Sequence, residues 1–151
     1  MEDTLIILKP DGVNKKLLSK VIKRFYDEGL IVSNLKAMVL DKDLLKEHYS
    51  HLVLKKFYPE LESYMLSGVV VLMIVSGENA ILKVREIIGD TNPTKALPNT
   101  IRGEFGDKEF VTRNVIHASD SYENALIEIK RFYHEENDII DKNNYVYQKR
   151  R

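Results

Sequence analysis

The sequence predicts a mixed α/β (α+β) domain, because segments typical of strands alternate with amphipathic helical segments. Two apolar runs, residues 4–9 and 69–75, have the length and composition of buried strands. Between the strands, apolar residues recur at the spacing of one helix face. The predicted order is β-α-β-(α)-β-α-loop-β-α. It fits both a doubly wound parallel sheet and the ferredoxin-like βαββαβ plan, and periodicity alone does not choose between them.

Strands are predicted at residues 4–9, 31–40, 69–75 and 114–117. The first is closed by a turn at Pro10-Asp11-Gly12. The second is rich in residues that favour strands. The third is apolar throughout, which predicts a strand buried on both faces. The fourth ends at His117.

Helices are predicted at residues 17–26, from residue 44, after Pro59, at 81–88 and at 125–133. Gly29 and Gly89 are placed to end two of them. Residues 89–112 show no clear period. A loop of this length is uncommon in a compact domain and is usually functional.

Composition limits the class of protein. The 151 residues are 44% apolar and 30% charged, which fits one domain over residues 1–151, with 134–151 as a polar C-terminal tail. The 23 basic residues balance the 23 acidic ones, which disfavours a nucleic-acid scaffold. The absence of cysteine excludes disulfides and thiolate metal sites. With neither a signal peptide nor an apolar run long enough for a bilayer, we expect a cytoplasmic protein without membrane or stable nucleic-acid partners.

The common nucleotide-binding motifs are absent. No P-loop, no G-x-G-x-x-G and no H-E-x-x-H sequence occurs. Any bound phosphate must therefore be held by cations that are scattered along the chain.

Residues 114–121 form the most informative segment, since a histidine ends a strand just before a helix begins. The candidate N-caps are Ser119, Asp120 and Ser121, and Asp120 and Glu123 have the spacing of a capping box. A helix N-terminus favours the neutral, nucleophilic form of His117 and can stabilise negative charge on a transferred group. On physics alone, the commoner interpretation is a capped helix with a histidine hydrogen-bonded in the core.

Several motifs carry a resemblance to a known family. The segment Asn114-x-x-His117-Ala118-Ser119-Asp120-Ser121 resembles the active-site signature of nucleoside diphosphate kinases. Residues 7–13, the His48-Tyr49 pair, residues 89–93 and residues 100–105 resemble, in order, other segments of this family. The resemblance implies a ferredoxin-like βαββαβ core, with a four-stranded antiparallel sheet covered by helices and a long nucleotide-binding loop. It also implies transfer of the γ-phosphate of a nucleoside triphosphate to a diphosphate.

The resemblance implies roles for residues that act on the phosphates. His117 would be the nucleophile, and Lys9 would contact the transferred phosphate. Tyr49 would support both, while Arg85 and Arg102 would grip the β- and γ-phosphates with planar, permanently charged groups. Without the resemblance, Lys9 would be interpreted as a snorkelling lysine at the end of a strand and Arg85 as a solvated charge.

The remaining site residues are also implied by the resemblance. Thr91 would bond phosphate, and Asn114 would contact the ribose and a bridging phosphate oxygen. Glu128 would orient His117 through its other ring nitrogen, with Ser119 close by. The two apolar residues expected to sandwich the base are Phe57 and Val111, with Phe110 as the alternative to Val111.

The family works by a ping-pong mechanism through a phosphohistidine, which implies nucleoside tri- and diphosphates as partners. No carboxylate cage is evident, so Mg²⁺ is expected to arrive on the nucleotide phosphates. The family is oligomeric, which implies a homo-oligomer, first a hexamer, with a tetramer or dimer as alternatives. Two other hypotheses compete: a catalytically weak scaffold relative, and a polyanion or membrane-surface protein using the tail residues Lys149-Arg150-Arg151.

The sequence departs from the family pattern within the loop. Asn99 replaces a usual glycine, and it tolerates positive φ better than other residues if the backbone requires it. Glu104 replaces Asp, and Glu60 replaces Gly after Pro59. Residues 106–112 are longer than usual by about two residues, which is why Phe110 competes with Val111 for the base.

Overall fold

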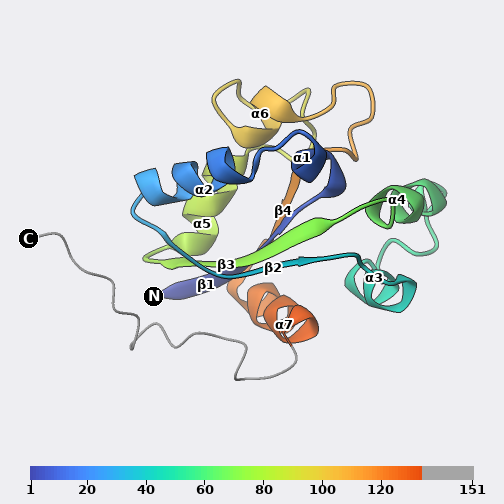
Figure 1. Ribbon diagram of the computed structural model, residues 1–151, viewed down its shortest axis with the longest axis horizontal. Coiled ribbons are helices and arrows are strands. Elements are labelled where there is room, and N and C mark those ends of the chain that lie inside the picture. Colours follow the sequence, from blue (N-terminus) through green and yellow to red (C-terminus); the bar gives the residue numbers. More distant parts are fainter. Residues whose placement is uncertain (134–151) are drawn as a thin grey trace, which may run out of the picture.

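The computed structural model describes residues 1–133 and contains one antiparallel sheet with the order β2-β3-β1-β4 (Figure 1). The strands are β1 (Glu2–Leu8), β2 (Ile31–Met38), β3 (Val70–Gly77) and β4 (Ile116–Ala118). β1 pairs with β3 and β4, and β2 pairs with β3, all antiparallel. The ferredoxin-like prediction is therefore confirmed, and the doubly wound parallel sheet is excluded.

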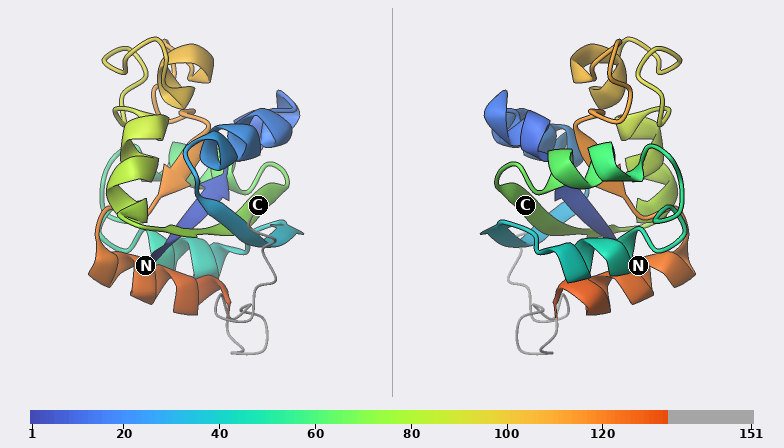
Figure 2. Two further views of the ribbon diagram at one scale, coloured as in Figure 1. Left: turned by 90° about the vertical axis from the view of Figure 1, so that its left-hand side faces the viewer. Right: turned by 90° about the vertical axis from the view of Figure 1, so that its right-hand side faces the viewer.

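Helices cover the sheet. They are α1 (Pro10–Asn14), α2 (Leu18–Asp27), α3 (Lys42–His48), α4 (Tyr58–Met65), α5 (Ala80–Ile88), α6 (Ile101–Phe105) and α7 (Tyr122–Phe132). The views from the two ends show α2 and α5 on one face and α3 and α7 on the opposite face (Figure 2). No helix in the described part of the chain is long and apolar enough to cross a membrane.

The alternation of side chains along β1 divides the core in two. Ile6 and Leu8 pack with α2 and α5, while Leu5 and Ile7 pack with α3, α4 and α7. Residues Val70–Gly77 of β3 are all buried, as its apolar run predicted. Even-numbered and odd-numbered residues of β1 therefore pack against opposite layers of helices.

Some local predictions are wrong. The predicted turn at Pro10-Asp11-Gly12 is the helix α1, with Pro10 in the first turn that proline favours. The predicted loop 89–112 contains α6, whose N-cap Thr100 accepts a hydrogen bond from the Gly103 amide at 3.1 Å. The positive φ that would have required a glycine at position 99 is not present, so Asn99 is accommodated there without backbone strain.

Two further corrections concern the end of the chain that carries His117. β4 begins at Ile116 rather than residue 114, because Val115 has a φ of 75°, outside the extended conformation of a regular strand. The N-cap of α7 is Ser121, which accepts from the Asn124 amide at 3.1 Å. Asp120 is therefore not a capping-box residue, and it accepts a side-chain bond from Asn124 instead.

We predict that Gly103→Ala destabilises the fold, since α6 touches the preceding loop. A Cβ at Gly103 would lie 1.9 Å from the carbonyl oxygen of Leu97, and backbone atoms cannot move aside cheaply. The expected loss in free energy of unfolding is about 1–3 kcal/mol, measured by urea denaturation. The control is Gly68→Ala, whose Cβ would meet only Pro10 Cβ, at 3.8 Å. Equal stability of the two variants would contradict this packing.

Candidate active site

The pairing of β1 with β4 brings the predicted nucleophile and the predicted phosphate lysine together. His117 lies opposite Ile7, and Lys9 follows Ile7 by two residues. Alternate residues of a strand face the same side, here the side of α3 and α7. The helices on that face carry Glu128 and end beside Tyr49. The site is thus assembled at one end of the sheet by β1, β4 and two helices.

Glu128 fixes the ring of His117. His117 Nε2 lies 3.0 Å from Glu128 Oε1, and Ser119 Oγ donates to the same oxygen at 2.7 Å. Burial alone would raise the pKa of the Glu128 carboxyl. The hydrogen bonds from His117 and Ser119, with the imidazole charge, bring that pKa below its ordinary value instead. Because Glu128 occupies Nε2, Nδ1 is the ring nitrogen that remains for a substrate.

Lys9 is linked to the loop through Asn114. Lys9 Nζ donates to Asn114 Oδ1 at 2.7 Å, and Asn114 Nδ2 donates to the carbonyl of Thr91 at 2.8 Å. Burial first, and then the charge of Arg102, lower the pKa of the Lys9 ammonium to about 7. A phosphate placed beside this amine would favour its charged form. A bound anion would therefore supply the counter-charge that stabilises the Lys9 ammonium.

Arg102 is held by the backbone. Its guanidinium donates from Nη1 to the carbonyl of Gly89 at 3.0 Å and from Nη2 to that of Ile116 at 2.7 Å. Burial and the neighbouring charge of Arg85 lower the pKa of Arg102 to about 10, so it stays charged near neutral pH. These bonds orient the cation without supplying a counter-charge.

Tyr49 and His48 complete the wall beneath His117. Burial first, and then Glu128, raise the pKa of the Tyr49 hydroxyl above its usual range, so it remains a neutral phenol. The His48 ring lies 4.7 Å from the His117 ring, centroid to centroid, at an interplanar angle of 81°. In the sequence, His48 stands out only as half of the His-Tyr pair, and no role was predicted for it.

Arg131 sets the state of His48 and was also missed. Arg131 Nη1 lies 2.9 Å from His48 Nδ1, and an arginine can only donate, so that nitrogen is the acceptor and Nε2 carries the proton. Burial first, and then the charge of His117, lower the pKa of His48 to about 3. His48 is therefore neutral at physiological pH. The only sequence signal is the three-residue spacing from Glu128, which places both side chains on one helix face.

Two cavities join at the site. One has a volume of about 320 Å³ and is lined by Lys9, His48, Tyr49, Arg85, Thr91, Arg102, Asn114, His117 and Glu128, among others. The other has a volume of about 400 Å³ and is more apolar, with Phe57, Leu52, Leu61 and Val111 in its wall. They share Lys9, Tyr49, Thr91 and Asn114. Together they form a cleft with a cationic half and an apolar half, as phosphates and a base require.

The structure places Phe57 and Val111 in the apolar half, whereas Phe110 does not line it. The Phe110 ring instead lies 4.9 Å from the guanidinium of Arg113. All other predicted site residues line the cleft except Ser119, which acts behind Glu128.

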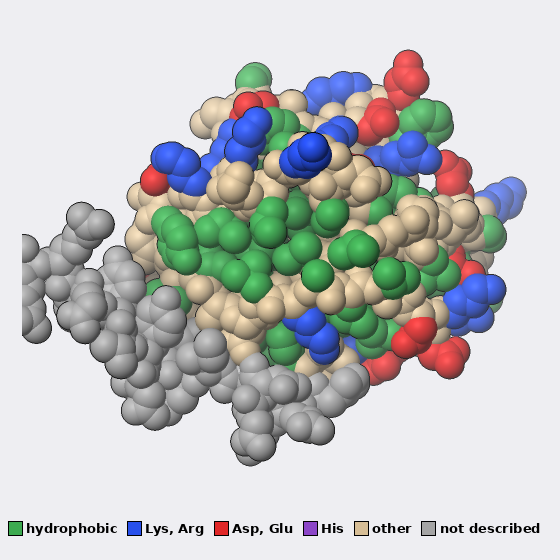
Figure 3. All heavy atoms as spheres, in the orientation of Figure 1, with side chains coloured by type: hydrophobic (Ala, Val, Ile, Leu, Met, Phe, Trp, Pro, Cys, Tyr) green, Lys and Arg blue, Asp and Glu red, His purple; other side chains and the backbone are tan. Residues whose placement is uncertain are grey.

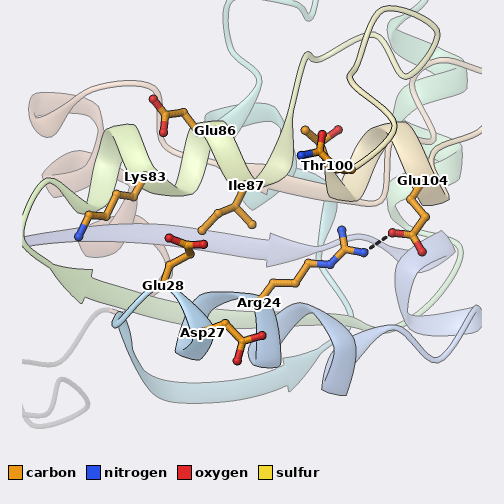
Figure 4. Close-up of a pocket in the computed structure, with 9 residues that line it drawn as sticks. Arg24, Asp27, Glu28, Lys83, Glu86, Ile87, Thr100 and Glu104 are labelled. Atoms are coloured by element: carbon orange, nitrogen blue, oxygen red, sulfur yellow. Dashed lines mark hydrogen bonds and ion pairs between the residues drawn. The ribbon is translucent and has the colours of Figure 1, made fainter.

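A third cavity is poorly suited to polyphosphate. It has a volume of about 490 Å³ and lies between α2, α5 and the start of α6 (Figure 4). Its wall contains four carboxylates against two cations, and Arg24 is paired with Glu104. None of the predicted site residues lines it.

The similarity of the chain to known proteins shows the family to which it belongs. A family model described as nucleoside diphosphate kinase matches residues 2–138. The chain belongs to this family. It is 47% identical over 135 residues to the nucleoside diphosphate kinase of Acetivibrio thermocellus, covering 89% of this chain and 98% of the relative. The corresponding enzyme of Methanocaldococcus jannaschii is 45% identical over 141 residues, covering 93% and 99%.

A solved structure gives the same result. The crystal structure of the nucleoside diphosphate kinase from Encephalitozoon cuniculi superposes with a TM-score of 0.87 at 36% identity, covering 97% of this chain and all of that one. The resemblance inferred from the motifs is confirmed. The chain is an enzyme with nucleoside diphosphate kinase activity, and its substrates are nucleotides.

We predict that Lys9 makes the stability of the nucleotide-free protein rise with pH above neutrality. The pKa of Lys9 falls from 10.5 to about 7 on folding, so between these values the unfolded chain binds more protons than the folded one. Stability attributable to this group is therefore gained as pH rises through that window. Relative to Lys9→Met, the wild type should gain about 2 kcal/mol in free energy of unfolding between pH 7 and pH 9. A pH-independent difference between the two proteins would contradict a buried, destabilised ammonium.

Proposed function

We propose that the kinase works by a ping-pong mechanism in which His117 is transiently phosphorylated. The observation that carries this proposal is the hydrogen bond between Glu128 and His117 Nε2, which reserves Nδ1 for the substrate. Lys9, Arg85 and Arg102 supply cations to the same cavity. Phosphoryl transfer depends mainly on such positioning and charge stabilisation.

In the first half-reaction, the lone pair of His117 Nδ1 attacks the γ-phosphorus of a nucleoside triphosphate. A P–N bond forms, and the bond from γ-phosphorus to the bridging oxygen breaks, with its electron pair leaving on the diphosphate. The ring then bears phosphorus on Nδ1 and a proton on Nε2, and the Glu128 carboxylate stabilises its positive charge. An acceptor diphosphate reverses these steps.

The other site residues are proposed to bind the substrate. Arg85, Arg102 and Thr91 hold the phosphates, and Lys9 follows the transferred group. Tyr49, as a neutral phenol, donates to the phosphate. Asn114 contacts the ribose and a bridging oxygen. Contact of Phe57 and Val111 with the faces of the base, rather than its edge, allows many bases to bind.

Mg²⁺ is proposed to enter as part of the nucleotide substrate. The described residues whose atoms converge most closely are His48, His117 and Glu128, within 4.8 Å of one another. Two imidazoles and one carboxylate do not suit Mg²⁺, which prefers oxygen ligands. In addition, Glu128 Oε1 is already hydrogen-bonded to His117, and His48 Nδ1 already accepts from Arg131.

Self-association is also proposed, with a hexamer first and a tetramer or dimer as alternatives. Within residues 1–133, β2 is an edge strand of the sheet, and apolar side chains gather in a band on the adjoining face (Figure 3). Tyr26 of α2 and Leu35 of β2 are 53% and 52% exposed. Exposed strand edges and apolar patches favour association. Sedimentation velocity would distinguish the three assemblies.

A cytoplasmic location stays a prediction, and the basic tail lies outside the described residues.

The phosphoenzyme provides the main test. After incubation with ATP and Mg²⁺ and removal of nucleotide, the intact mass at alkaline pH should increase by one phosphoryl group. The group should be acid-labile, absent from His117→Ala and discharged by GDP. If nucleotide binds but no phosphoryl group is gained, the scaffold hypothesis replaces the mechanism proposed here.

A second prediction concerns the metal. Titration of nucleotide-free protein with Mg²⁺ alone should give no saturable heat at sub-millimolar concentration, because the cavity is cationic and lacks an oxygen cage. ATP should bind in the presence of Mg²⁺. Saturable Mg²⁺ binding that is lost in Glu128→Gln would establish a resident metal site instead.

A further inference from the structure

The backbone immediately before the nucleophile strand adopts a strained turn. Val115 has a φ of 75°, and the Ile116 amide donates to the carbonyl of Asn114 at 2.9 Å. An i to i+2 hydrogen bond around a residue with positive φ is a γ-turn of the rare, strained kind. Positive φ is especially unfavourable for a β-branched residue. Other contacts must therefore hold Val115 in this conformation.

The turn controls the direction of two site residues. Asn114, on one side of it, binds Lys9 Nζ and the Thr91 carbonyl. On the other side, the carbonyl of Ile116 accepts from Arg102, and His117 follows. If Val115 relaxed to an ordinary φ, Asn114 and His117 would change their relative orientation. The geometry of phosphoryl transfer then depends on what maintains the turn.

Asp11 holds the turn from outside the cleft. Its Oδ2 accepts from the Val115 amide at 3.1 Å, while the carbonyl of Val115 accepts from the Lys9 amide at 2.8 Å. Both backbone polar groups of Val115 are thus bound by the segment that follows β1. Gly12 permits this approach, because a Cβ there would lie 3.0 Å from the Val115 carbonyl oxygen.

Tyr64 orients the Asp11 carboxylate. The Tyr64 hydroxyl donates to Asp11 Oδ1, and the Asp11 amide donates to the Tyr64 hydroxyl at 3.2 Å. Arg113, one residue before Asn114, lies 5.4 Å from the Tyr64 ring. One carboxylate oxygen of Asp11 therefore binds Tyr64 of α4, and the other binds the Val115 turn.

We propose that Asp11, oriented by Tyr64, is a positioning residue for phosphoryl transfer, because it keeps the Val115 turn in its strained conformation. The inference rests on the proposed function of His117. The simpler alternative is that Asp11 only stabilises the first turn of α1, where an acidic residue is favourable. That role would affect stability but would not depend on the φ of Val115.

The test uses the difference between glycine and alanine at position 115. Glycine adopts positive φ without strain, whereas alanine does not, and both remove most of the Val115 side chain. The rate of His117 phosphorylation by ATP should fall about 10- to 100-fold in Asp11→Ala, the effect of losing one or two charge-assisted hydrogen bonds. Adding Val115→Gly should recover about tenfold of this loss, and adding Val115→Ala should not.

Each outcome decides something. Asp11→Ala at the wild-type rate, or equal rates for the glycine and alanine double variants, would overturn the inference. If wild type itself gains no phosphoryl group, the proposed function fails instead. Rates are compared only between variants with a folded circular dichroism spectrum.

A second pair of variants keeps the inference testable if Asp11→Ala does not fold. Tyr64→Phe should lower kcat without raising KM for nucleotide, because the ground-state contacts remain. The matched control is Tyr133→Phe. It removes the hydrogen bond that the Tyr133 hydroxyl donates to the Asn34 carbonyl at 2.7 Å, far from the turn. Equal kcat for the two Tyr→Phe variants would contradict the role of Tyr64.

Discussion

Lys9 and Arg102 are buried cationic side chains whose hydrogen-bond acceptors are neutral oxygens rather than carboxylates. Burial and neighbouring cations lower the pKa of both groups. The ligands of Arg102 are the carbonyl oxygens of Gly89 and Ile116, which contribute dipoles rather than a charge. A carboxylate in their place would stabilise the free protein but compete with phosphate. The cleft therefore keeps a positive potential that a polyphosphate satisfies, although the acids Asp120 and Glu128 also line it.

The acid that serves His117 is kept on the opposite side of the ring. Glu128 comes from α7, whereas Lys9 caps α1 and the arginines come from α5 and α6. Its second hydrogen bond, from Ser119, fixes the carboxylate itself. His48 lies beside this pair, yet Arg131 and burial keep it uncharged. A charged His48 would repel positive charge on the neighbouring His117 ring, so a neutral His48 is compatible with the nucleophilic role proposed for His117.

Much of the fold follows from local patterns. The apolar runs of β1 and β3 and the helical faces of α2, α5 and α7 are readable because each buries one face or both. The helices α1 and α6 are five residues each, too short for a period to appear. Periodicity could not choose between a parallel and an antiparallel sheet, and the resemblance did.

The candidate site, like the fold, was only partly predictable from local patterns in the sequence. The resemblance, rather than any spacing, pointed to Lys9, Arg102 and Glu128, which come together only through the pairing of β1 with β4 and the packing of α7. The pair of His48 and Arg131 is separated by 83 positions and matches no motif, and the spacing of Arg131 from Glu128 is the only sign of it in the sequence. The strain at Val115 is likewise invisible in sequence, because valine is the residue least expected at positive φ.

The nucleotide-binding loop shows why a segment without periodicity can still be ordered. Its unusual stretch, residues 106–112, contains Lys108, whose Nζ donates to the carbonyls of Pro93 and Gly103 at 2.8 and 2.7 Å. These bonds tie the two halves of the loop together next to Arg102. Asp107 closes the stretch by accepting from the amides of Glu109 and Phe110. Hydrogen bonds between residues that are separated in the chain, rather than a repeating apolar face, therefore determine the conformation of residues 106–112 beside Arg102.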